Sequence, residues 1–335
     1  MNGNGLILNE ERFYRTLDQI RYALEHKKGI FRHGIKHFLP QWNLPKEMEH
    51  QPQQMEPKQP YEASLYLLTR AYCDRMSQSR YLMRRTKETW QSPDRRWIFY
   101  PKEVVKAGPE KAEVALKSFF NYALRLSDKM TAGEGYFQNC KTLKKYFSSD
   151  PRKIIEGRKI EDIQEDMKEL HGIDTISNLI IVEFLDRNLA RPLDPENALF
   201  KVDRHKARIP VNTNSIAYSD PTRHIHHYTL IAPLEKAYLQ YCHDRKLTIE
   251  QMVELDAAVW VVGSEGCAKK NYSYCHAHCP LVDDLCISLV EFNDGIKRNG
   301  RRMSGSRKGC FIPYENGIRT DIRSNLGQQD LFREF

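Results

Sequence analysis

The chain has 335 residues and a mass of 39.4 kDa, enough for two domains or one elaborated domain with an ample core. Its 52 Lys and Arg against 44 Asp and Glu give a net charge of +8, which permits an anionic partner without identifying one. Hydrophobic residues make up 40% of the chain, and its 17 Gly and 16 Pro are ordinary numbers for a globular protein, so disordered and collagen-like classes are excluded.

The sequence contains no apolar run of the roughly 20 residues that a membrane-spanning helix requires. Its best candidate stretch, residues 176–185, contains Glu183 and is followed by Asp186. The first residues carry neither the basic segment nor the long apolar segment of a secretory signal. We therefore expect a cytoplasmic protein that does not enter a membrane, and we expect it to act as a monomer.

Apolar residues recur mostly at intervals of three and four, and alternating patterns typical of strands are scarce, so the sequence predicts an all-α fold. The Pro- and Gln-rich residues 51–60 interrupt this pattern, and the Pro-, Asn- and Asp-rich residues 188–227 are predicted to form a long loop with short turns. Thr248 followed by Gln251 is a capping box that marks the start of the last helix. Helices are expected at residues 9–26, 62–90, 101–127, 137–147, 160–170, 175–187, 228–244 and 248–262.

Residues 170–181 form a short turn between two of these helices, and Gly172 permits a tight backbone there. Backbone amides from Asp174 to Ser177, at the positive end of the second helix, would suit a phosphate. An ordinary corner between two helices is the alternative interpretation.

Further along, Asp203 lies between a hydrophobic stretch and the start of a basic helix. Aspartate at such a boundary is by default an N-cap, and a catalytic carboxylate is the alternative. Five of the nine residues from Lys201 to Ile209 are basic or His, so a nearby anion is expected.

Four of the eight cysteines lie close together, in the pattern Cys-x7-Cys-x3-Cys-x6-Cys. Bunched thiolates in a reducing compartment indicate an inorganic centre more than disulfides. Only one pair has the spacing of a zinc knuckle, which favours a [4Fe–4S] cluster; zinc with His276 or His278 and a site without metal remain alternatives. These cysteines are Cys267, Cys275, Cys279 and Cys286.

Taken in this order, the Leu-x-Gly-Ile turn, the Val-Asp-x-His segment and the terminal four-cysteine loop resemble the helix-hairpin-helix DNA glycosylases of the endonuclease III type. The resemblance covers residues 62–290. It implies a helical barrel domain over 62–187 that ends in the hairpin, and a cluster-bearing domain over 188–290 on which residues 1–61 pack. Residues 291–335, with the basic run 297–302, would be an extension.

The resemblance also assigns roles to single residues. Asp203 matches the catalytic aspartate, and the four bunched cysteines match the cluster ligands. Residues 68–78 are similar to the turn from which this family inserts a side chain into the duplex, and Gln78 is the candidate. The residues expected to contact DNA are Gln78, Arg75, Gly172, Thr175, Ser177, Arg204 and His205.

Two departures from the family's pattern refine the expected activity. Asp174 replaces a second glycine of the hairpin, and Ile176 replaces the lysine that strand-cleaving members carry, so no lyase activity is expected. The expected function is a monofunctional glycosylase that hydrolyses the N-glycosidic bond of a damaged or modified base in double-stranded DNA, with Asp203 stabilising the oxocarbenium-like state. The alternatives are an N-glycosidase on a free modified nucleoside, nucleotide or RNA base, and a non-catalytic cluster-bearing protein that binds nucleic acid.

Overall fold

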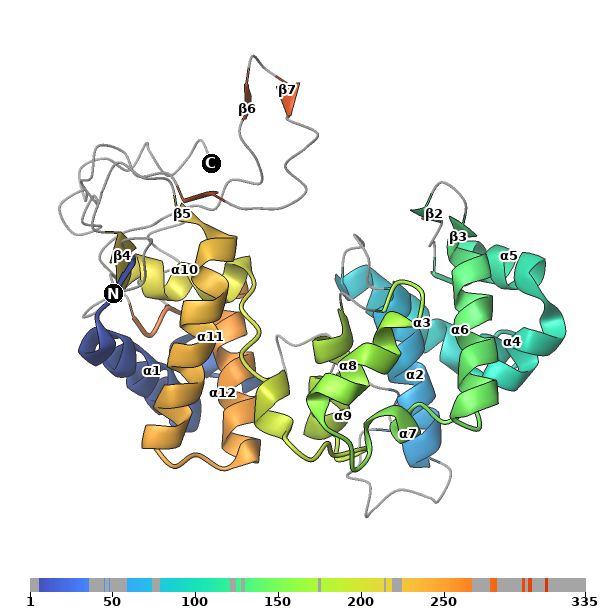
Figure 1. The fold of residues 1–335 in the computed structure, drawn as a ribbon, viewed down its shortest axis with the longest axis horizontal. Helices are drawn as coiled ribbons and strands as arrows, with labels where there is room; N and C mark the ends of the chain where they lie inside the picture. The colour runs from blue at the N-terminus through green and yellow to red at the C-terminus, as the bar shows by residue number, and fades with distance from the viewer. Residues whose placement is uncertain are drawn as a thin grey trace. The chain divides into compact units, whose positions relative to one another are not determined.

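The structure is a computed structural model, and it confirms a mostly helical protein, with 74% of the described residues in helices. The described residues are 6–35, 45, 48, 59–73, 79–120, 125–127, 130–173, 176–213, 215–218, 225–266, 278–281, 297–298, 301–302 and 311–312. The chain forms two compact units (Figure 1). We call Leu39–Leu199 the central unit, and Met1–Phe38 with Phe200–Phe335 the terminal unit.

The central unit contains eight α-helices among its described residues, together with two short strands that pair antiparallel. In chain order its elements are α2 (Gln59–Cys73), α3 (Ser79–Gln91), η6 (Arg96–Phe99), α4 (Pro101–Ala107), α5 (Pro109–Phe120), β2 (Arg125–Ser127), β3 (Met130–Thr131), α6 (Ala132–Tyr146), α7 (Arg152–Ile155), α8 (Ile160–Lys168), α9 (Ser177–Asp186) and η8 (Pro195–Ala198).

Helix α2 lies at the centre of this unit, because every residue from Ala63 to Cys73 is buried. Tyr66 stacks on Phe99 with ring centroids 5.6 Å apart and meets Trp90 edge-on at 5.7 Å. A buried ion pair between Arg70 and Glu183 joins α2 to α9. The helix that follows the predicted hairpin is therefore fixed to the core of its own unit.

The terminal unit is built from segments at both ends of the chain. Its elements are β1 (Leu6–Leu8), α1 (Glu10–Glu25), η1 (Gly29–Phe31), α10 (Arg204–Asn212), β4 (Ile216–Tyr218), β5 (Ile225–His226), α11 (His227–Asp244), α12 (Ile249–Val261), the π-helix η9 (Val262–Gly266), β6 (Lys297–Arg298), β7 (Arg301–Arg302) and β8 (Phe311–Ile312). Helices α1, α11 and α12 run beside one another (Figure 1).

The amino-terminal segment is tied to the rest of this unit by main-chain and apolar contacts. Strand β1 pairs antiparallel with β4, and the Asn9 amide donates to the Ser215 carbonyl at 2.8 Å. Asn9 also caps α1, whose buried face includes Leu17 and Ile20. Phe13 on that face meets Tyr238 of α11 at 5.0 Å between ring centroids. The first helix thus completes the core that supports α10 and α12.

Two expected helices prove to be pairs of helices. The predicted helix 62–90 corresponds to α2 and α3, and the predicted helix 101–127 corresponds to α4 and α5, followed by β2. Between α4 and α5, Gly108 adopts φ +90°, a conformation that ends α4, and Pro109 begins α5. Between α2 and α3 the boundary was missed because α2 is buried on all sides from Ala63 to Cys73, so no exposed polar face marks where it ends.

Two further segments differ from expectation. The segment 188–227, predicted as a loop, contains helix α10 with Pro210 inside it, together with η8 and β4. Helix α6 starts five residues before the expected position 137, at a capping box formed by Thr131 and Glu134.

Within the described part of the chain, no helix is both long and apolar enough to cross a bilayer.

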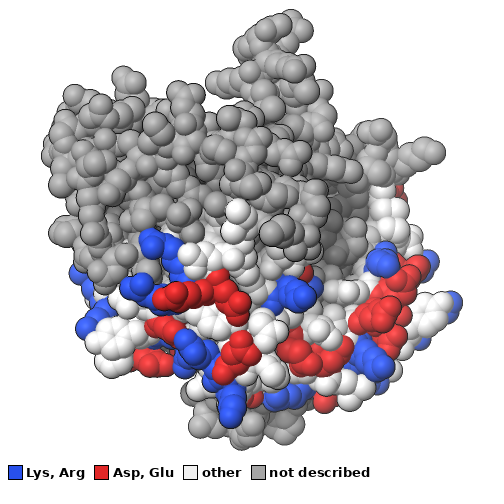
Figure 2. Space-filling view, turned by 60° about the vertical axis from the view of Figure 1, so that its left-hand side comes forward, with Lys and Arg blue, Asp and Glu red and all other residues white. Residues whose placement is uncertain are grey.

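Charged side chains are mixed in sign on the face drawn in Figure 2. Over its described part, basic and acidic residues alternate in small groups. Separately from this view, the ion pairs of the terminal unit include Arg245 with Asp18 at 2.6 Å and Arg21 with Glu25 at 3.5 Å. The described part of this face therefore offers no broad field of one sign.

Candidate active site

Asp203 is the N-cap of α10, as the default interpretation of the sequence predicted. Its backbone is extended, with φ −97° and ψ −176°, and its Oδ1 accepts hydrogen bonds from the amides of His205 and Lys206, each at 2.9 Å. These amides would otherwise lack partners in the first turn of the helix. The positive end of the helix dipole lies at the same point and favours a negative group.

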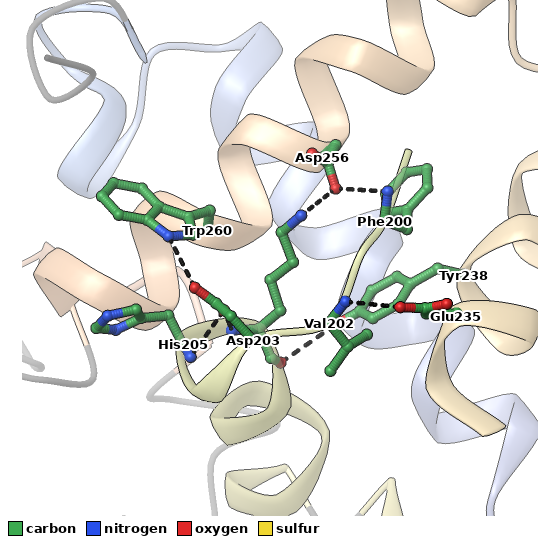
Figure 3. A network of polar contacts seen from close by, with 9 residues as sticks. Phe200, Val202, Asp203, His205, Glu235, Tyr238, Asp256 and Trp260 are labelled. Atoms are coloured by element: carbon green, nitrogen blue, oxygen red, sulfur yellow. Dashed lines mark hydrogen bonds and ion pairs between the residues drawn. The ribbon is translucent and has the colours of Figure 1, made fainter. Parts of the chain in front are cut away.

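The second oxygen of the same carboxylate contacts a different helix. Trp260, near the end of α12, donates from its indole Nε1 to Asp203 Oδ2 at 3.1 Å (Figure 3). Both side chains are half-buried. The carboxylate thus accepts three N–H groups, two from main chain and one from a rigid ring, on a residue that is only half-buried.

The residues just before Asp203 are held by two carboxylates from neighbouring helices. Asp256 of α12 accepts from the amide of Phe200 at 2.9 Å, and Glu235 of α11 accepts from the amide of Val202 at 3.1 Å (Figure 3). Glu235 also pairs with Lys201 at 3.3 Å. The entry to α10 is therefore fixed at alternate residues by acidic side chains.

Phe200 is strained, because it adopts φ +54° although it is not glycine. It is fully buried, and its ring stacks on Tyr238 with an interplanar angle of 8° and centroids 5.2 Å apart. A left-handed backbone at a bulky residue persists only where the surroundings determine it, and such residues cluster at functional sites. Here stacking and the Asp256 hydrogen bond supply that constraint three residues before Asp203.

A buried ion pair lies beneath the same turn. Lys206 Nζ contacts Asp256 Oδ1, with side chains only 9% and 11% exposed. The hydroxyl of Tyr238 donates to the Lys206 carbonyl at 3.4 Å. Burial, together with the negative charges of Asp256 and Asp203, raises the pKa of Tyr238 well above its usual value, so the phenol stays protonated.

Helix α10 also packs closely on the π-helix η9. A Cβ at Gly263 would collide with the main-chain oxygen of His205, so only glycine allows the two backbones to approach this closely. Arg208 donates to the Gly263 carbonyl at 3.3 Å. Because Cys267 follows η9 directly, the turn that carries Asp203 is packed against the segment leading to the cysteine-rich loop.

Of the four bunched cysteines, the structure describes only Cys279, which is half-buried. Cys267, Cys275 and Cys286 lie outside the described residues. Within the described ranges, no group of three His, Cys, Asp or Glu side chains is arranged to hold a metal ion. Beside Cys279, the carbonyl of His278 lies so close to Gly29 that a Cβ at Gly29 would collide with it.

The predicted hairpin belongs to the central unit. Helix α8 is followed by a turn in which Gly172 adopts φ +74°, the left-handed conformation expected of it. Asn139 of α6 pairs with the main chain of His171 in both directions, donating to its carbonyl at 2.9 Å and accepting from its amide at 2.7 Å. Ser177 begins α9 and is buried. Asp174 and Thr175 lie outside the described residues.

The structure describes some of the remaining candidates for DNA contact. Arg75 and Gln78 lie outside the described residues. Arg204 is the first residue of α10, and only its backbone is described. The ring of His205 meets Trp260 edge-on at 5.7 Å, and its Nδ1 lies 3.3 Å from Arg208. The structure thus gathers His205 and Asp203 around Trp260.

Three residues of this site were not identified from the sequence: Trp260, Asp256 and Glu235. Asp256 could have been noticed in the sequence, because it is an acidic residue on the otherwise apolar face of a predicted helix. In the structure that face is turned inward, and Asp256 is 8% exposed. An isolated carboxylate at such a position needs a cationic or N–H partner. Asp256 and Trp260 are also four residues apart, so they lie on the same face of α12.

Comparison of the sequence with protein-family models and with curated proteins gave no match. The resemblance to endonuclease III-type glycosylases therefore depends on the residues of this chain alone.

Proposed function

We propose that the protein is a monofunctional DNA glycosylase that acts on a damaged or modified base, with Asp203 as its catalytic carboxylate. The observation that carries the proposal is the burial and hydrogen bonding of the Asp203 side chain. It is half-buried, and three N–H donors hold it at the start of α10, in the segment whose sequence resembles the family's catalytic motif.

The chemistry requires such a group. Cleavage of an N-glycosidic bond builds positive charge on the sugar as the base departs with the bonding electrons. A carboxylate already oriented at that position stabilises the charge without reorganising, and it can orient the attacking water. The base must leave the stack to reach it, so the substrate we propose is duplex DNA that contains a weakened or modified pair.

Two features of the central unit support the same activity. The turn at Gly172 has the left-handed backbone of a helical hairpin, and Asn139 holds it to α6. At position 176 the chain carries Ile, half-buried directly before α9, where a lyase would need an amine. The proposed product is accordingly an intact strand with an abasic site.

We further propose that Cys267, Cys275, Cys279 and Cys286 bind a [4Fe–4S] cluster with a structural role. The donor set is four soft thiolates within twenty residues. Anaerobically purified protein should be brown and contain about four iron and four sulfide per chain. A colourless preparation with one zinc per chain would replace the cluster by a zinc site.

The experiment that tests the activity is base release from a panel of duplexes, each with one modified or mismatched base, followed by alkali cleavage of the abasic product. Asp203→Asn should abolish release and leave duplex binding intact. Asparagine caps helices as well as aspartate does, so this variant removes the charge and keeps the cap. Asp244→Asn is the matched control, because Asp244 ends α11 and is bound by Tyr14 and Gln240.

Other outcomes identify other activities. Release from free modified nucleosides and never from polymer would make the protein a nucleoside N-glycosidase. Tight, salt-sensitive duplex binding without release from any substrate would make it a non-catalytic binding protein. Asp203→Asn with wild-type release would remove Asp203 from the reaction.

A further inference from the structure

The two oxygens of Asp203 are held in different ways. Oδ1 accepts two main-chain amides, whose positions are set by the first turn of α10. Oδ2 accepts one donor from the described residues, the indole N–H of Trp260 at 3.1 Å. Among the described residues, Oδ2 is therefore held by a single side chain, which comes from another helix, whereas Oδ1 is held by main chain.

We propose that Trp260 is the positioning residue of the reaction, which fixes Asp203 Oδ2 so that its remaining acceptor site faces the sugar. This inference rests on the proposed function. A carboxylate has about four acceptor sites, and the three N–H groups fill three of them. The remaining site is on Oδ2, where it can meet the positive sugar or a water molecule.

The chemistry of the indole suits this role. Indole is a donor only, so it cannot take up a proton and compete with Asp203 as a base. Its ring is rigid, and the ring of His205 lies edge-on against it with centroids 5.7 Å apart. A flexible donor such as lysine would lose more conformational entropy in holding the same position.

Helix α12 supports the catalytic turn at two points. Trp260 holds the carboxylate, and Asp256, one helical turn earlier, holds Phe200 and Lys206 on either side of it. Because both side chains project from one face of the same helix, any displacement of α12 moves the carboxylate and its turn together. The carboxylate is thus positioned relative to α12 as well as to α10.

The first test compares Trp260→Phe with wild type in single-turnover base release, using the best duplex found in the panel. Phenylalanine keeps an aromatic ring beside His205 and removes the N–H. The expected result is a rate about 10- to 100-fold lower with an unchanged duplex Kd, since a small misplacement of a reacting group has effects of this size. Trp97→Phe is the control, because Trp97 packs near Phe119 in the central unit.

The second test does not require activity. In protein labelled with ¹⁵N at tryptophan, the Trp260 indole resonance, assigned by its loss in Trp260→Phe, should shift in Asp203→Asn, because this variant changes the group that accepts the indole N–H. Full folding of Trp260→Phe is checked by its amide spectrum, and if that variant does not fold, specific labelling assigns the resonance in wild type.

The outcomes separate this inference from the function on which it rests. If wild type and Trp260→Phe release the base at the same rate, the positioning role of Trp260 is wrong and the proposed glycosylase activity still stands. An indole resonance indifferent to Asp203→Asn also overturns the positioning role. No release by wild type from any substrate overturns the proposed function, whatever the resonance does. A slower Trp260→Phe with unchanged Kd and a responsive resonance supports both.

Discussion

Replacing Asp256 by Ala should destabilise the terminal unit strongly, because the change leaves two buried groups without their acceptor. Lys206 is 9% exposed and would lose the carboxylate that pairs with it, and the amide of Phe200 would lose its hydrogen bond. Removing one partner of a buried ion pair costs about 3–5 kcal/mol. An orphaned buried amide costs about 1–3 kcal/mol, but the two losses share one side chain and will not simply add. We expect a total of about 4 kcal/mol.

A paired replacement separates the two costs. In Lys206→Met with Asp256→Leu, both charges are gone and the volume is largely kept, so the charge penalty should disappear. The amide of Phe200 still lacks an acceptor, so about 1–3 kcal/mol of destabilisation should remain. The double variant is therefore expected to be more stable than Asp256→Ala, although it carries one more substitution.

Urea unfolding at neutral pH gives the comparison, and hydrogen exchange of residues 200–212 assigns it to the terminal unit, because two units need not unfold together. Glu25→Ala is the matched control: its pair with Arg21 is on the surface of the same unit and should be worth about 0.5 kcal/mol or less. A loss below about 1 kcal/mol in Asp256→Ala, or a double variant no more stable than it, would refute the reasoning.

Three further predictions follow from other contacts. Asn139→Ala should cost about 1–3 kcal/mol in urea unfolding, because two hydrogen bonds to the buried side of the hairpin turn are lost. Burial alone would raise the pKa of Asp18, but the hydrogen bonds from Arg245 and Tyr241 lower it. The stability that Asp18 contributes is therefore present above the ordinary aspartate pKa and is lost as pH falls. Wild type and Asp18→Asn should accordingly converge in stability below about pH 4. Replacing Arg298 and Arg301 by Ala should reduce the salt dependence of duplex binding by up to about 1.8 in log–log slope.

Each of these has its own control. Asn139→Asp keeps the acceptor but places an oxygen against the His171 carbonyl at a position that is 2% exposed, so it should be no more stable than Asn139→Ala; wild-type stability in either variant would contradict the role of the two hydrogen bonds. A constant difference between wild type and Asp18→Asn from pH 7 to pH 3 would contradict the acid prediction. An unchanged salt slope would show that the strands β6 and β7 do not contact phosphate.

Periodicity predicted best those helices that bury one face. Helices α1, α11 and α12 match their expected ranges within one or two residues, because a polar face alternates with an apolar one in α1 and because Thr248 and Gln251 mark the start of α12 as a capping box. The pattern predicts poorly where that contrast is missing. Every residue of helix α2 from Ala63 to Cys73 is buried, including the polar Ser64, Thr69 and Arg70, so no exposed polar face marks where α2 ends and α3 begins.

The candidate site could be predicted only in part, for a similar reason. The N-cap role of Asp203 depends on residues two and three positions away, which is a distance that sequence patterns cover. Its contact with Trp260 spans 57 residues, and the contact of Lys206 with Asp256 spans 50. Such contacts are set by how α10 and α12 pack, and no local pattern encodes that packing.

The structure shows what lies beside the basic residues 201–209. From the sequence, five basic or His residues in nine indicated a nearby anion. Lys201 pairs with Glu235, Lys206 pairs with Asp256, and Arg208 donates to a carbonyl of η9. The anions beside Lys201 and Lys206 are therefore carboxylates of the protein itself, contributed by α11 and α12.

This internal pairing bears on how the site would meet DNA. A cation already bound to a buried carboxylate releases few counterions on binding a phosphate, so Lys206 should add little to the salt dependence of duplex binding. The same pairing keeps strong charges fixed beneath Asp203, where they hold its turn rather than the substrate. Lys206 is therefore better suited to holding the turn that carries Asp203 than to binding a phosphate, and under the proposed function the cations that bind DNA would be other residues of the chain.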